Sequence, residues 1–140
     1  MGLKVPQHEA VAMSIPAEAS IDYDRLMQAN LKRVFGERDA GRRLAAIREL
    51  YATDAVLNEP QAAATGHAAI NGAVTALLSN LPPTFAFSAI GPAVGHHGVG
   101  RLRWQSGPPN GPVAVSGTDV AQFQGDLIQT LHVFLDPPAA

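Results

Sequence analysis

The sequence predicts an α+β fold, in which helices come first and an antiparallel sheet follows. Through the first 81 residues, apolar side chains recur mainly at the three- and four-residue spacing of amphipathic helices. From residue 84 onward they recur at alternate positions, and short segments rich in Gly and Pro separate the runs. Helices followed by hairpin-linked strands are typical of the α+β class.

The first helix is expected to begin near Ser20 and to end at Gly36. Asp22 and Asp24 supply a capping side chain and negative charge at its start. Its apolar stripe, with spacings of four, four and three, consists of Tyr23, Met27, Leu31 and Val34. Phe35 extends this stripe.

Two more helices and one strand complete the first half. The second helix is expected over residues 39–51, with Arg43 among the charged side chains that point outward. A strand over residues 55–59 follows, and Pro60 ends it because proline lacks a backbone donor. After a loop over residues 61–66, Pro82-Pro83 ends a third helix. The apolar positions of this helix are Ile70, Val74, Leu77, Leu78 and Leu81.

Four strands are expected in the second half, over residues 84–90, 99–106, 113–124 and 126–135. If Gln124 and Gly125 form a two-residue turn in the last hairpin, Asp119 lies opposite Thr130. One face then carries three polar side chains, namely Asp119, Thr130 and His132. The apolar side chains around them are Phe123, Ile128 and Phe134. This arrangement predicts a pocket, although the parity of the 99–106 strand stays open.

Length and composition fit one globular domain over residues 21–140, preceded by a flexible leader over residues 1–20. The net charge of −2 gives no basis for binding nucleic acid or an acidic membrane. The absence of cysteine excludes disulfides and thiolate chemistry. No apolar run is long enough for a membrane span or a signal peptide, so we expect a cytoplasmic protein. A charged fraction of only 16% favours a homodimer that buries part of the surface.

Two carboxylates, Glu59 and Asp119, are the main candidates for chemistry, because apolar strands carry both and buried acids are costly. Glu59 is a candidate base, or else a solvated carboxylate at a strand end. Asp119 is a candidate acid or base, or else the partner of Arg101 or Arg103 in an ion pair across the sheet.

His132 is a candidate proton shuttle beside Asp119, or else a hydrogen-bonded histidine of the sheet. The other histidines, His67, His96 and His97, show no spacing typical of metal ligands, and no metal site is predicted. Several aromatic side chains are expected to build the core and the pocket wall. With Thr130, these candidate ligand contacts are Phe35, Phe87, Trp104, Phe123 and Phe134. For Trp104 the alternative is burial in the dimer face.

Several short motifs resemble the nuclear transport factor 2-like superfamily, and within it the SnoaL-like group. The resemblance covers roughly residues 22–136 and rests on four segments: Leu50-Tyr51-Ala52-Thr53-Asp54-Ala55-Val56, Glu59-Pro60, Gly66 with Ile70, and Asp119-Val120-Ala121-Gln122-Phe123-Gln124-Gly125. It implies a cone-shaped, curved sheet wrapped by three N-terminal helices, with a pocket in the hollow. It also implies a homodimer through the open face of the sheet.

The same resemblance implies roles for the two acids. Glu59 falls where ketosteroid isomerases keep a catalytic base before a proline, and Asp119 falls where they keep a protonated aspartic acid that binds an oxyanion. The first-helix tyrosine of those isomerases has no counterpart at Val34-Phe35. This departure argues against ketosteroid isomerase activity itself.

Three functional hypotheses follow. The first is a cofactor-free cyclase, isomerase or dehydratase acting on a small, mostly apolar carbonyl compound. In it Glu59 or Asp119 removes a proton, and the other acid or His132 stabilises the enolate. The second is a non-catalytic module that binds a small hydrophobic molecule, and the third is a dimerisation module with a vestigial pocket.

Overall fold

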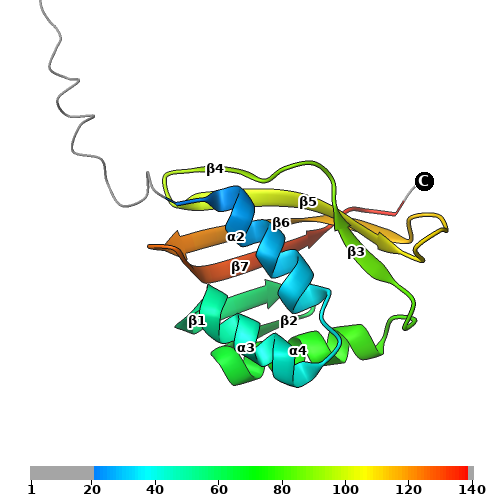
Figure 1. Ribbon diagram of the computed structural model, residues 1–140, viewed down its shortest axis with the longest axis horizontal. Coiled ribbons are helices and arrows are strands. Elements are labelled where there is room, and N and C mark those ends of the chain that lie inside the picture. Colours follow the sequence, from blue (N-terminus) through cyan, green and yellow to red (C-terminus); the bar gives the residue numbers. More distant parts are fainter. Residues whose placement is uncertain (1–20, 139–140) are drawn as a thin grey trace, which may run out of the picture.

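The computed structural model describes residues 21–138, so the predicted leader lies outside the described residues. Within that range the order of elements confirms the α+β prediction, with three helical segments and a curved, open sheet of seven strands (Figure 1). None of the helices in residues 21–138 is long and apolar enough to cross a membrane.

The first helix contains a change of helical geometry. Helix α2 (Tyr23–Asn30) runs directly into a π-helical turn, η2 (Leu31–Phe35). The side chain of Asp22 caps the start by accepting a 3.1 Å hydrogen bond from the Arg25 amide. At the other end the Gly36 amide donates to the Leu31 carbonyl over 2.9 Å, five residues back, which defines the wider turn.

Helices α3 (Ala40–Leu50) and α4 (His67–Ser79) pack against each other through apolar faces and one buried arginine. The prediction that Arg43 points outward was wrong. Its Nε donates to Asn71 Oδ1 over 2.8 Å and its Nη1 to the Glu37 carbonyl over 2.6 Å. Its Nη2 donates to Thr75 Oγ1. These three acceptors satisfy the buried guanidinium and fix the two helices together.

The seven strands are β1 (Tyr51–Glu59), β2 (Ala62–Thr65), β3 (Ala86–Ala89), β4 (Val94–His96), β5 (Val99–Gly107), β6 (Val115–Gln124) and β7 (Leu127–Leu135). Their order is β2-β1-β7-β6-β5-β3, with β4 also paired to β5. One pair, β1 with β7, is parallel, and the others are antiparallel. Strands β2 and β4 were not predicted, because each is short and neither shows an alternating pattern.

The helices cover one face of the sheet. Figure 1 shows α2 crossing the sheet, with α3 and α4 near β1 and β2. On β5 the inward residues Leu102 and Trp104 are buried, whereas Arg101 and Arg103 are exposed. The sequence left open which side chains of β5 face the helices, and the structure shows that Leu102 and Trp104 do. The predicted alternative of an ion pair between Asp119 and these arginines was wrong, because Asp119 lies on the inner face.

The predicted register of the last hairpin was also wrong. The turn residues are Gly125, with φ of 61°, and Asp126, so glycine takes the first turn position as in type II′ turns. A bulge beside Phe123 shifts the pairing further. Asp119 therefore pairs with Val133, three residues beyond the predicted Thr130. Side chains of a strand alternate between its two faces, so a shift by an odd number of residues exchanges the faces. Thr130, His132 and Phe134 therefore lie on the face opposite to Asp119, and not on the same face as predicted.

Candidate functional site

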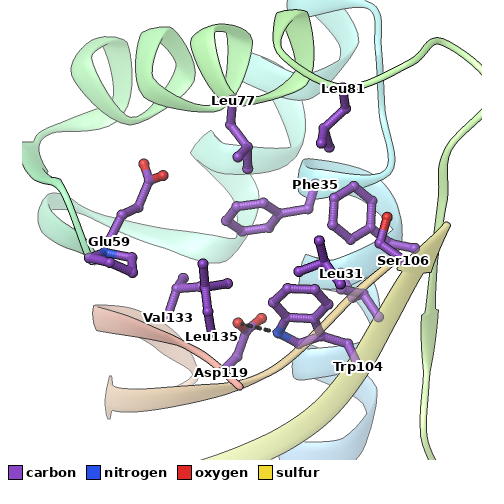
Figure 2. A pocket seen from close by; sticks show the side chains of 13 residues that line it. Leu31, Phe35, Glu59, Leu77, Leu81, Trp104, Ser106, Asp119, Val133 and Leu135 are labelled. Carbon is purple, nitrogen blue, oxygen red and sulfur yellow. Dashed lines mark hydrogen bonds between the residues drawn. The ribbon is translucent and has the colours of Figure 1, made fainter. Parts of the chain in front are cut away.

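A cavity of about 220 Å³ lies between the inner face of the sheet and the helices (Figure 2). Its wall is almost entirely apolar, and among the described residues that line it only Glu59, Ser106 and Asp119 have side-chain oxygens. The remaining lining residues are Leu31, Phe35, Pro60, Leu77, Leu81, Phe87, Trp104, Val115, Val133 and Leu135. Polar groups in such a wall have few competing partners, so each is a candidate contact for a bound molecule.

Asp119 projects from β6 into this cavity and is 3% exposed. The indole Nε1 of Trp104 donates a 2.9 Å hydrogen bond to its Oδ1. Burial raises the pKa of Asp119 to about 7, although the indole hydrogen bond acts in the opposite direction. Near neutral pH the carboxyl group is therefore present in both protonation states, as acid–base chemistry requires.

Trp104 is held in place by its neighbours on the sheet. It lies opposite Gly117 on β6, and a Cβ at Gly117 would come within 2.6 Å of the indole Cζ2. The Phe87 ring packs against the indole with ring centroids 5.7 Å apart. The missing side chain at position 117 thus leaves room for the indole, and Phe87 supports it in the orientation that reaches Asp119.

Glu59 comes from the end of β1, immediately before Pro60, and it is half-buried. Burial raises its pKa above the usual value. It lines the same cavity as Asp119, but Figure 2 shows its carboxylate set apart from the Asp119–Trp104 pair. A molecule in the cavity can therefore lie between the two acids.

The other predicted site residues divide into three groups. Phe35 and Phe87, like Trp104, line the cavity. Phe123 lies instead in the core against Tyr23, with ring centroids 5.5 Å apart. The remaining three, Thr130, His132 and Phe134, lie on the outer face of β7 as a result of the register shift.

His132 is therefore not beside Asp119. Its ring stacks on Phe134 with centroids 6.2 Å apart, and its Nδ1 lies 3.5 Å from Asn58 Nδ2. It lines a second, more open groove at the end of β1 and β7 that Glu59 also borders. The proton-shuttle role beside Asp119 was wrong for this geometric reason.

Two features of the interior were missed by the sequence reasoning. Ser106 lines the cavity and is buried, and its position two residues after Trp104 on one strand was the available signal. In the core the Tyr51 hydroxyl donates a 2.5 Å hydrogen bond to Asn30 Oδ1, with both residues buried. Burial, together with the negative charge of Asp119, raises the pKa of Tyr51 well above its ordinary value. Tyr51 thus stays a neutral phenol.

Comparison with known structures gives several matches over most of the chain. A candidate isomerase of the SnoaL-like family from Agrobacterium tumefaciens is 24% identical, with a TM-score of 0.76, covering 82% of this chain and 97% of that one. A candidate polyketide cyclase from Sinorhizobium meliloti is 15% identical, with a TM-score of 0.61 and coverage of 87% and 97%. A candidate ketosteroid isomerase from Kribbella flavida is 14% identical, with a TM-score of 0.61 and coverage of 84% and 83%.

At these identities the structural matches establish the fold and not the reaction. None of the curated proteins matches the chain significantly. The family model for the SnoaL-like domain matches residues 32–130, which is well over half of the sequence and includes most of the π-helical turn, both acids and most of the sheet. The chain therefore belongs to the SnoaL-like family.

Proposed function

We propose that the protein is a cofactor-free isomerase, cyclase or dehydratase that acts on a small, mostly apolar carbonyl compound. The observation that carries this proposal is Asp119, a buried acid whose pKa is about 7 and which is hydrogen-bonded to Trp104. It shares one apolar cavity with a second acid, Glu59. Two acids in different environments are the usual basis for dividing the roles of base and proton donor.

The two environments assign the roles. Glu59 keeps contact with solvent and ionises more readily than the deeply buried Asp119. Glu59 is therefore the base that takes a proton from the carbon next to the carbonyl. Asp119 in its protonated form donates a hydrogen bond to the carbonyl oxygen as negative charge develops there, a contribution of about 3–4 kcal/mol for one such donor.

The enolate that results can react in three ways. In a substrate with a neighbouring C=C bond, return of the proton from Glu59 to the far carbon of the extended enolate moves the double bond. Expulsion of a hydroxyl group from the β-carbon, with the proton held by Glu59, releases water. Attack of the enolate carbon on a second carbonyl within the same molecule closes a ring, and the new alkoxide takes the proton held by Glu59. Each route uses the same two acids, and the shape of the substrate selects among them.

A proton-exchange assay with 2-tetralone, a compact bicyclic ketone, tests the proposal. In D₂O the wild-type protein is expected to accelerate α-deuterium incorporation measured by NMR. Asp119→Asn should lower this rate by about 10²- to 10³-fold, and Glu59→Gln should abolish the acceleration. Asp54→Asn is the control, because Asp54 is an exposed carboxylate of the same strand as Glu59. Binding of 2-tetralone without exchange would instead support a non-catalytic binding protein.

We also propose that the protein forms a homodimer through the outer face of the sheet. Phe134 is 57% exposed there, and Val99 is exposed on the same face. Large apolar side chains on an uncovered sheet face favour burial by a second surface.

A further inference from the structure

Ser106 is the one hydroxyl among the described residues that line the cavity, and its environment is unusual. The residue is 3% exposed, yet its Oγ has no hydrogen-bond partner within residues 21–138. Buried hydroxyl groups are nearly always paired, and serine usually bonds to nearby backbone. An unpaired, buried hydroxyl in a cavity wall is therefore a group that a bound molecule can satisfy.

The backbone around Ser106 is fixed on both sides. Ser106 pairs with Phe87 on β3 and with Val115 on β6, and its carbonyl accepts a 2.9 Å hydrogen bond from the Ala114 amide. Because the residue lies between two strands, only rotation about its side-chain bond can move the Oγ. The Oγ is fully buried in this rotamer, and rotation about that bond would bring it to the cavity surface.

Ser106 and Asp119 lie at separate places along the cavity. Asp119 pairs with Leu102, and Ser106 lies four residues further along the same strand, which is about 13 Å of extended chain. Trp104 lies between them on the same face, and Figure 2 shows Ser106 on the far side of the indole from Asp119. Where the two side chains keep this backbone separation, the span that remains after a hydrogen bond at each end suits a two-ring skeleton better than a single ring.

We propose that Ser106 is a second polar anchor that selects substrates with two polar ends. The substrate class is a two-ring or similarly long apolar molecule. At one end is the enolisable carbonyl that meets Asp119, and at the other is a hydroxyl or carbonyl group that meets Ser106 Oγ. This inference rests on the proposed function, because it takes the reacting carbonyl to bind at Asp119.

Two matched naphthols test the anchor without requiring turnover. 2-Naphthol offers one hydroxyl, and 2,6-dihydroxynaphthalene offers one at each end of the same skeleton, so it fits in either direction. The wild-type protein should bind the diol about five- to tenfold more tightly than 2-naphthol, the worth of one net hydrogen bond. Ser106→Ala should remove this preference and leave the affinity for 2-naphthol unchanged, measured by calorimetry.

Ser88→Ala is the matched control, because Ser88 is an exposed serine on the neighbouring strand β3 and should keep the preference. Equal affinity of the wild-type protein for both naphthols would overturn the anchor. The anchor would also be overturned if Ser106→Ala lowered the affinity for both naphthols by the same factor. Failure of the wild-type protein to bind either compound would overturn the proposed acid site and this inference with it.

A thermal melt separates the anchor from a structural role. Because the Oγ of Ser106 has no partner in the described fold, Ser106→Ala should keep or raise the melting temperature. A clear fall in melting temperature, together with an unchanged preference for the diol, would show that the hydroxyl serves the fold instead.

Discussion

The indole Nε1 of Trp104 donates a hydrogen bond to Oδ1 of Asp119 in a wall that is otherwise almost entirely hydrocarbon. The bond comes from a neutral donor, so it only partly offsets the cost of burying a negative charge. This partial compensation leaves the pKa of Asp119 near 7, where a small environmental change alters the protonation state. The second oxygen of the carboxyl group stays available to a molecule in the cavity.

Replacement of Trp104 by Phe should raise the pKa of Asp119 further, because the indole hydrogen bond lowers it in the wild-type protein. The measurement is an NMR titration of the Asp119 carboxyl carbon. Leu77→Val is the control, since Leu77 lines the same cavity from α4 and its change removes no hydrogen bond. An unchanged or lower pKa in Trp104→Phe would contradict the role assigned to the indole.

The stability of the fold should depend on pH through Asp119. Its pKa rises from 3.8, the value of a solvated aspartate side chain, to about 7 in the fold, so the unfolded chain releases this proton first. The contribution of Asp119 to the free energy of unfolding is therefore greatest below pH 4 and falls as the pH rises to about 7, by roughly 3–4 kcal/mol.

Asp119→Asn removes that dependence, and the amide can still accept the indole hydrogen bond. Subtracting the free energy of unfolding of the wild-type protein from that of Asp119→Asn, measured by urea denaturation from pH 4 to 8, isolates this group. We expect this difference in the free energy of unfolding to increase in favour of the variant as the pH rises. A difference that stays constant over this range would show that Asp119 titrates normally.

The buried pair of Tyr51 and Asn30 should behave non-additively. Tyr51→Phe leaves the Asn30 Oδ1 without its 2.5 Å donor and should destabilise the protein by about 1–3 kcal/mol. The double variant Tyr51→Phe with Asn30→Leu removes both polar groups and should recover part of that loss. Denaturant titration of both single variants and the double variant completes the cycle. If the loss of stability in the double variant equals the sum of the losses in the two single variants, the hydrogen bond between Tyr51 and Asn30 contributes little to stability.

The homodimer should depend on apolar side chains of the outer face. Phe134→Glu places a charge at an exposed position of β7 and should give a monomer, as measured by sedimentation velocity. Val113→Glu is the control, because Val113 is similarly exposed but lies in the loop before β6. A wild-type protein that sediments as a monomer would end the dimer proposal.

The sequence carried most of the information on the fold and less on the site. Helical spacing in residues 23–34 and alternation in residues 99–106 mark those elements, because each buries one face of a regular structure. The two acids were found because charge is rare on buried strands. Tyr51 and Ser106 were missed, since an isolated polar residue becomes informative only when its partners in space are known.

The pairing of β6 with β7 shows why the face of a side chain is hard to predict. Gln124 and Gly125 suggested a turn, but glycine at the first turn position and a bulge beside Phe123 together move the register by three residues. Neither feature changes the hydrophobic pattern enough to be detected in the sequence. His132 was assigned to the wrong side of the sheet for that reason.

The wider turn of η2 holds one residue more than an ordinary α-helical turn. Each residue of an α-helix accounts for about 100° of rotation, and each residue of the wider turn accounts for less. Removing one residue from Leu31–Phe35 would therefore restore α-helical geometry, with the capped start of α2 and the residues after the turn on nearly the same faces as before. Homologues whose first helix is one residue shorter should keep the sheet contacts of α2 and differ mainly at the turn itself, where Leu31 and Phe35 border the cavity, so a different shape of substrate should fit there.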